Sequence, residues 1–109
     1  MDHVSLDNLT LATFLPAVNT AFRVRVSDSA SVEFALTRAT PPRHAHPDAD
    51  DHKSFSLSFL GPTDRVLEQR IYPFEHDMIG RFDLFIVPVG RSAKGIEYQA
   101  VFNRAEPEA

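Results

Sequence analysis

Apolar and polar residues alternate along most of the segment 54–104, and this period of two constrains the fold more than any other feature of the chain. At the start of the segment, Phe55, Leu57 and Phe59 alternate with serines. Such alternation is typical of strands that bury one face and expose the other. Turn-forming residues such as those of Gly61–Asp64 separate the apolar runs. The sequence therefore predicts a series of antiparallel strands.

The N-terminal half contributes two more strands and a different lead-in. Alternation over residues 22–26 and 32–37, with a polar turn between them, predicts a hairpin. In residues 1–20, Thr10 can cap a short helix over Leu11–Leu15, and the following proline ends it. We expect this segment to pack against an end or an open face of the sheet.

The C-terminal half supplies the remaining strands. We expect them over Val66–Ile71, Arg81–Val89 and Ile96–Asn103, with Pro73 restricting the first to a bend or an edge. Arg81–Val89 is apolar on both faces, so its second face needs a cover, from the N-terminal turn or from a partner. About six sequential antiparallel strands and nine phenylalanines predict a single mainly β domain, either a small barrel or a two-layer sandwich.

Composition narrows the classes of function. The chain has no cysteine, a net charge of −4 and a pI of about 5.6, with its basic residues scattered, which argues against nucleic-acid binding. No signal peptide is visible, and no apolar run approaches the roughly 20 residues that span a bilayer. We expect a cytoplasmic protein without a membrane interaction. No cofactor motif is present, and no cofactor is predicted.

Residues 40–53 form a long polar surface loop in this interpretation, and residues 104–109 a frayed tail. The loop contains His44, His46 and His52 together with several aspartates, which are possible ligands for a transition metal. Its prolines and its lack of a hydrophobic anchor favour a solvated loop over a preorganised metal site.

Four polar-tipped residues at or near strands could form a ligand or partner surface: Tyr72, His76, Tyr98 and Asn103. The two tyrosines could line a cavity inside a barrel. His76 lies between two carboxylates, which could orient it as a general base, but no nucleophile is apparent, and such clusters more often stabilise turns. No catalytic residue is predicted.

Several segments resemble a family of small uncharacterised bacterial domains. They are Phe55–Pro62, Ile71–Gly80, Phe82–Gly90 and Gly95–Asn103. The stretch Phe14–Phe22 is similar too, whereas residues 43–53 depart from the pattern as an insertion. The resemblance implies a compact bacterial protein without assigned activity, encoded near phage-tail-collar-like proteins. It carries over no catalytic residue.

These observations favour a non-enzymatic interaction or assembly module. An edge strand over Val66–Phe74 would bind a protein partner or a second copy of the chain, with Pro73 limiting uncontrolled pairing. A barrel that binds a small ligand is the first alternative. A metal-dependent protein that uses the histidine loop is the second.

Overall fold

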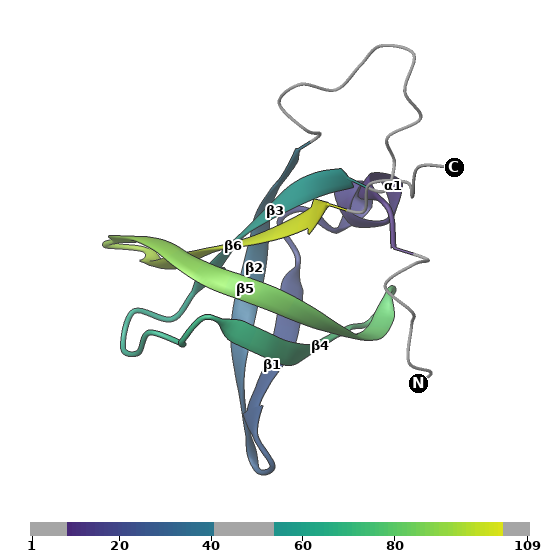
Figure 1. The fold of residues 1–109 in the computed structure, drawn as a ribbon. Coiled ribbons are helices and arrows are strands. Elements are labelled where there is room, and N and C mark those ends of the chain that lie inside the picture. Colours follow the sequence, from purple (N-terminus) through teal and green to yellow (C-terminus); the bar gives the residue numbers. More distant parts are fainter. Residues whose placement is uncertain (1–8, 41–53, 104–109) are drawn as a thin grey trace.

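The computed structural model describes residues 9–40 and 54–103, which form a closed antiparallel barrel of six strands with a short helical segment before them (Figure 1). The elements are α1 (Leu11–Phe14), the 3₁₀ helix η2 (Leu15–Ala17), β1 (Ala21–Ser27), β2 (Ala30–Thr40), β3 (Ser54–Gly61), β4 (Arg70–His76), β5 (Gly80–Ser92) and β6 (Gly95–Asn103). The mainly β prediction is confirmed, and of its two architectures the structure has the barrel.

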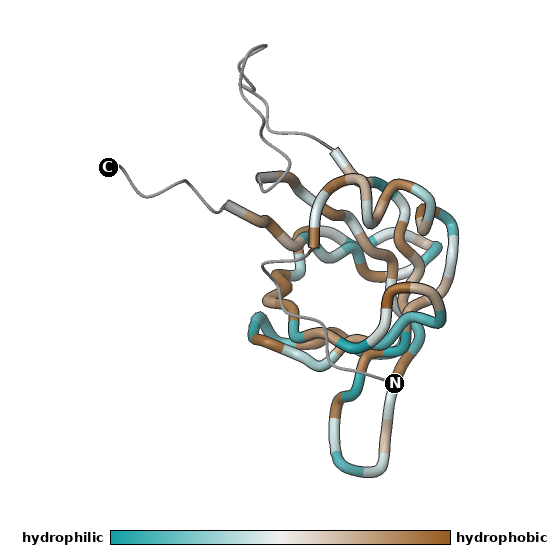
Figure 2. Tube along the Cα trace, turned by 90° about the vertical axis from the view of Figure 1, so that its right-hand side faces the viewer, coloured by the Kyte–Doolittle hydropathy of each residue, from teal (hydrophilic) through white to brown (hydrophobic). Residues whose placement is uncertain are grey.

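Strand order around the barrel is β1-β2-β3-β6-β5-β4, with β4 closing against β1. The predicted sequential order is therefore wrong after β3, because β3 pairs with β6 rather than with β4. The chain leaves β3 and reaches β4 through residues 62–69, which lie outside any strand. Alternation in a sequence identifies strands but not their neighbours, so this connection could not be seen in the pattern. Figure 2 shows the ring of strands, from which the β1–β2 hairpin projects.

The predicted strand Val66–Ile71 is also wrong in its position. Residues 66–69 form an irregular connection in which Leu67 is buried, and β4 begins at Arg70 and continues through Pro73. Proline has no N–H to donate to a neighbouring strand. It is tolerated there because β4 pairs with β1 only through Phe74 and Glu75, so Pro73 has no described ladder partner on the side away from β5.

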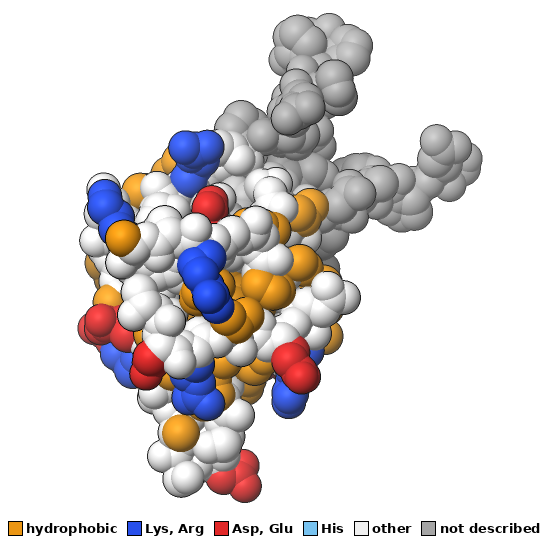
Figure 3. Space-filling model, turned by 90° about the vertical axis from the view of Figure 1, so that its left-hand side faces the viewer, with side chains coloured by type: hydrophobic (Ala, Val, Ile, Leu, Met, Phe, Trp, Pro, Cys, Tyr) orange, Lys and Arg blue, Asp and Glu red, His pale blue; other side chains and the backbone are white. Residues whose placement is uncertain are grey.

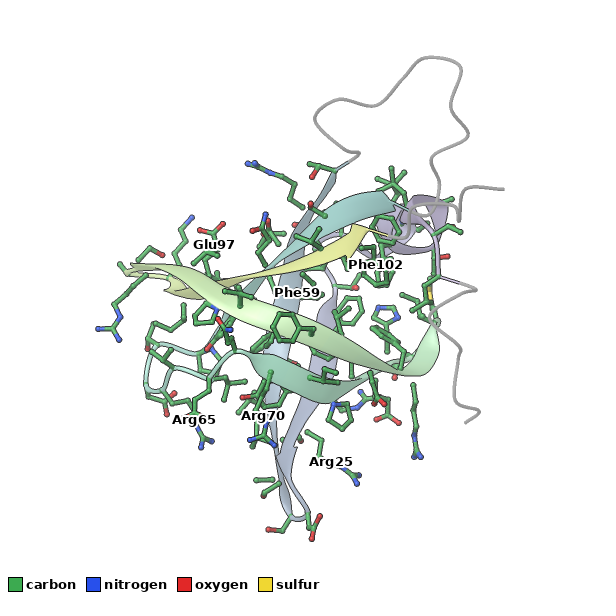
Figure 4. The ribbon with its side chains drawn as sticks, viewed as in Figure 1. Arg25, Phe59, Arg65, Arg70, Glu97 and Phe102 are labelled. Carbon is green, nitrogen blue, oxygen red and sulfur yellow. The ribbon has the colours of Figure 1, made fainter. Side chains whose placement is uncertain are left out.

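Phenyl rings fill the barrel. Eight of the nine phenylalanines are buried, and Phe85 is the exception. Their rings contact one another from strand to strand, as in the stacked pair Phe55–Phe102, with centroids 4.3 Å apart, and the perpendicular pair Phe22–Phe59 at 5.4 Å. In Figure 4, Phe59 and Phe102 lie within the barrel, while the labelled arginines point away from it. Aromatic packing of this density gives the small domain its core.

The N-terminal segment closes one end of the barrel. Thr10 caps α1 as predicted, through reciprocal bonds with Thr13, and Phe14 is fully buried. Leu15, which the sequence placed in the same short helix, is 52% exposed because the chain tightens into η2 at that residue. The described residues 9–20 do not cover the second apolar face of β5, where Phe85 is 48% exposed.

Thr40 ends β2, and the predicted loop 40–53 and tail 104–109 otherwise lie outside the described residues. Within the described ranges, no helix has the length and apolar character needed to span a bilayer.

Candidate functional site

The predicted metal ligands His44, His46 and His52 lie outside the described residues. Within residues 9–40 and 54–103, no group of three or more histidine, aspartate or glutamate side chains is arranged to hold a metal ion. Asn103 is the last residue of β6, where its backbone pairs with Ser54, and its side chain is not described.

The two tyrosines of the predicted surface are buried in the barrel. Tyr98 is fully enclosed, and its hydroxyl accepts a hydrogen bond of 2.8 Å from the backbone N–H of Leu67. Tyr72 donates a hydrogen bond of 2.9 Å to the carbonyl of Glu68, and burial is the main cause of its raised pKa. Both hydroxyls therefore hold the connection between β3 and β4 against the barrel, and neither side chain offers an exposed surface to a partner.

His76 is buried at the end of β4, and both of its ring nitrogens are engaged. Nδ1 accepts hydrogen bonds from the backbone N–H groups of Met78, at 3.1 Å, and Ile79, at 3.4 Å. The proton is consequently on Nε2, which donates to the Thr20 hydroxyl at 2.8 Å. Burial is the main cause of the lowered pKa of His76. The ring stabilises the turn between β4 and β5, which Gly80, at a φ of 109°, completes.

The carboxylates on either side of His76 point outward into an ion-pair cluster. Glu75 accepts hydrogen bonds from Arg23, at 2.7 Å, and Arg81, at 3.2 Å, while Arg23 also contacts Asp77 at 2.9 Å. The hydrogen bonds from Arg23 and Arg81 lower the pKa of Glu75. Neither carboxylate is hydrogen-bonded to the His76 ring in the described structure, so the three residues do not form the oriented base that their adjacency suggested.

A groove of about 440 Å³ lies on the outside of the barrel, where β1 and β4 meet. The described pairing between these strands consists of two residue pairs, Arg23 with Glu75 and Val24 with Phe74. Beyond them, the β1–β2 hairpin leads away from the other strands (Figures 1 and 2), which leaves a hollow beside β4 and β5. The lining residues are Arg23, Arg25, Asp28, Ser29, Ala30, Ser31, Pro73, Phe74, Glu75, Arg81, Phe82 and Asp83.

Charged groups without partners are found in this groove. Within the described residues, Arg25, Asp28 and Asp83 take part in no ion pair or side-chain hydrogen bond. Arg25 lies on β1, Asp28 at the hairpin tip and Asp83 on β5, so charges of both signs face the hollow from different elements. Such groups are available for contacts with another molecule.

An apolar pair continues the surface beyond the groove. In the β4–β5 ladder, the outward rows run from Glu75–Arg81 through Pro73–Asp83 to Ile71–Phe85. Ile71 is 60% exposed and Phe85 is 48% exposed, and they lie directly opposite each other. The sequence identified β5 as apolar on both faces, but the row formed with Ile71 depends on the β4 register, which the predicted strand Val66–Ile71 misplaced. We call the groove and this pair together the β4–β5 face.

A family model described as a domain of unknown function (DUF6916) matches residues 9–102. The chain belongs to this family. The match begins just before α1 and ends at the penultimate residue of β6, so it spans nearly the whole described barrel. The predicted resemblance to an uncharacterised domain family is confirmed. Searches of curated proteins and of solved structures found no match.

Proposed function

We propose that this domain is a non-enzymatic interaction or assembly module that binds a partner protein, or a second copy of itself, through the β4–β5 face. The observation that carries the proposal is the groove at the β1–β4 junction. It combines unpaired charges with an adjoining exposed apolar pair, Ile71 and Phe85. Protein interfaces typically have such an apolar centre with polar groups around it.

Backbone geometry supports the same face. Arg25 and Ser27 of β1 and residues 70–73 of β4 have a described ladder partner on one side only. Strand edges of this kind pair with extended segments of other chains. Pro73 offers no N–H, so it restricts which segments can pair along β4. The closed barrel thus replaces the long edge Val66–Phe74 expected from the sequence with a short, local opening.

The buried polar side chains of the barrel support a role without catalysis or cofactor, because they form hydrogen bonds within the protein. The hydroxyls of Tyr72 and Tyr98 and both ring nitrogens of His76 are bound by the protein itself. The phenyl rings occupy the interior that a small ligand would need. On the face shown in Figure 3, basic and acidic side chains are interspersed, which supports a partner other than nucleic acid.

The resemblance noted in the sequence adds bacterial origin and an accessory role in phage-tail-like assembly to the proposal, and the composition adds a cytoplasmic location. A survey of the genes beside members of the family tests that part. Neighbours without any relation to tail assembly would remove its support, while leaving the proposed face untouched.

Site-specific cross-linking tests the proposed face. A photoreactive amino acid at Asp83, in the groove, should capture a partner in the host cell, whereas the same probe at Arg38, exposed on β2, should not. Light scattering on the purified protein distinguishes self-association from a different partner. Phe85→Asp and Arg25→Glu should each weaken the captured complex by about tenfold, the usual effect of losing one central interface contact.

Matched substitutions away from the face provide the controls. Leu15→Asp replaces an equally exposed apolar side chain on η2, and Arg38→Glu reverses a charge on β2. Both should retain binding. If cross-linking is equal at positions 83 and 38, or if the control variants weaken binding as much as the groove variants, the β4–β5 face is not the interface.

A further inference from the structure

The N-terminal cap, residues 11–19, closes one end of the barrel, and the side chain of Phe14 lies at its centre. Phe14 is fully buried among four phenyl rings, those of Phe22, Phe55, Phe82 and Phe102, at centroid distances between 5.7 and 6.4 Å. These rings come from β1, β3, β5 and β6. Removing the cap would therefore open an apolar, ring-lined end of the barrel.

Few polar contacts hold this cap to the barrel in the described structure. The backbone N–H of Asn19 donates to the Leu36 carbonyl at 2.6 Å, and the N–H of Leu36 donates to the Thr20 carbonyl at 3.2 Å. The remaining link passes through side chains. The Thr20 hydroxyl donates to the Ala17 carbonyl at 2.6 Å and accepts the Nε2 proton of His76. His76 thereby connects the cap to the β4–β5 turn.

Protonation changes this link because it removes an acceptor. In the neutral ring, Nδ1 accepts from the N–H groups of Met78 and Ile79. An imidazolium carries a proton on Nδ1 as well, so the Nδ1–H group would face the N–H groups of Met78 and Ile79 with no acceptor between them. The turn that positions Nε2 toward Thr20 would then have to move. Burying the new charge beside the Phe22 ring, 4.4 Å away between centroids, adds a desolvation cost.

The charged groups around His76 in the described structure act on its pKa in opposite directions. Asp77, the next residue along the chain, raises the pKa of His76, and Arg23 of β1 lowers it. Arg23 is bound to both Asp77 and Glu75, and Glu75 is bound in turn to Arg81 of β5. Thr20 and Ala17, on the cap side, carry no charge. Burial is therefore the largest influence on the ring and favours its neutral form.

We propose that His76 is an acid-sensitive latch: its protonation releases the N-terminal cap and opens the ring-lined end of the barrel, while the strands stay paired. Since the folded structure favours neutral imidazole, the latch is intact above the ordinary pKa of 6.5. It weakens as the pH falls below that value and is lost as the pH passes through the lower pKa of the folded state. This latch is independent of the proposed partner face.

Hydrogen exchange of the full chain at pH 7.5 and at pH 5.0, corrected for the intrinsic exchange rate, tests the latch. Protection of residues 11–20 should fall by about fivefold to tenfold at the lower pH, the effect of losing one buried hydrogen bond. Protection in β3 and β6 should stay unchanged. His76→Gln should abolish the pH dependence of the cap. Changing the other four histidines, His3, His44, His46 and His52, to glutamine should preserve it.

Two further measurements keep the test decisive if His76→Gln does not fold. Thr20→Val should lower the protection of the cap already at pH 7.5. Nitrogen chemical shifts of the His76 ring in the wild-type protein should show the Nε2–H tautomer at pH 7.5. An Nδ1–H tautomer, a cap with equal protection at both pH values, or a uniform loss of protection across all strands would overturn the proposal.

Discussion

The hydroxyl of Tyr98 offers a sharp test of how the barrel holds its irregular connection. Tyr98→Phe removes the acceptor for the Leu67 N–H and leaves nearly everything else in place. The Phe34 ring stacks on Tyr98 at a centroid distance of 4.7 Å, and Gly61 approaches so closely that an added Cβ would lie 2.9 Å from the Tyr98 ring. Water has little room to replace the lost oxygen. A buried N–H without a partner costs about 1–3 kcal/mol, and we expect that loss in the free energy of unfolding.

Equilibrium unfolding in urea measures the cost, and amide exchange at Leu67 locates it. Tyr72→Phe is the matched control, because its hydroxyl donates to the carbonyl of Glu68, whose residue is exposed and can turn to water. That variant should lose only about 0.5–1.5 kcal/mol. If Tyr98→Phe is as stable as the wild type within about 0.5 kcal/mol, and the Leu67 amide exchanges at the same rate, the reasoning from buried hydrogen bonds fails here.

Three further substitutions test other parts of the structure. Phe14→Ala should cost about 3–5 kcal/mol in urea unfolding, because it empties the centre of a ring cluster, whereas Leu15→Ala beside it should cost under about 1 kcal/mol. Gly61→Ala should lower the thermal midpoint, at a cost of about 1–3 kcal/mol, since its Cβ would lie within 3 Å of two aromatic side chains. Glu75 has a lowered pKa, so its contribution should be present above pH 4.5 and lost as the pH falls through its folded value. Glu75→Gln, with Glu97→Gln as control, should remove that dependence from urea midpoints measured between pH 6 and 3.

The candidate face illustrates which functional features a sequence can and cannot reveal. The sequence predicted a ligand or partner surface at Tyr72, His76 and Tyr98 because they are polar residues in apolar strands. In the structure these side chains are buried and hydrogen-bonded to the backbone or to Thr20. Arg25 and Asp83 gave no signal, because charged residues on the outer side of strands are ordinary. They share a groove only because β1 closes against β4 over two residue pairs.

The sequence by itself determined the type of structure: alternation with a period of two predicted about six antiparallel strands, although it misplaced β4, and nine phenylalanines indicated an aromatic core. It also located the N-terminal helix and its Thr10 cap, since these depend on local chemistry. Strand neighbours, the path of residues 62–69 and the exposure of Phe85 were decided only by the tertiary structure. Pairing between distant strands depends on which faces pack together across the whole barrel, and local patterning carries no information about that choice.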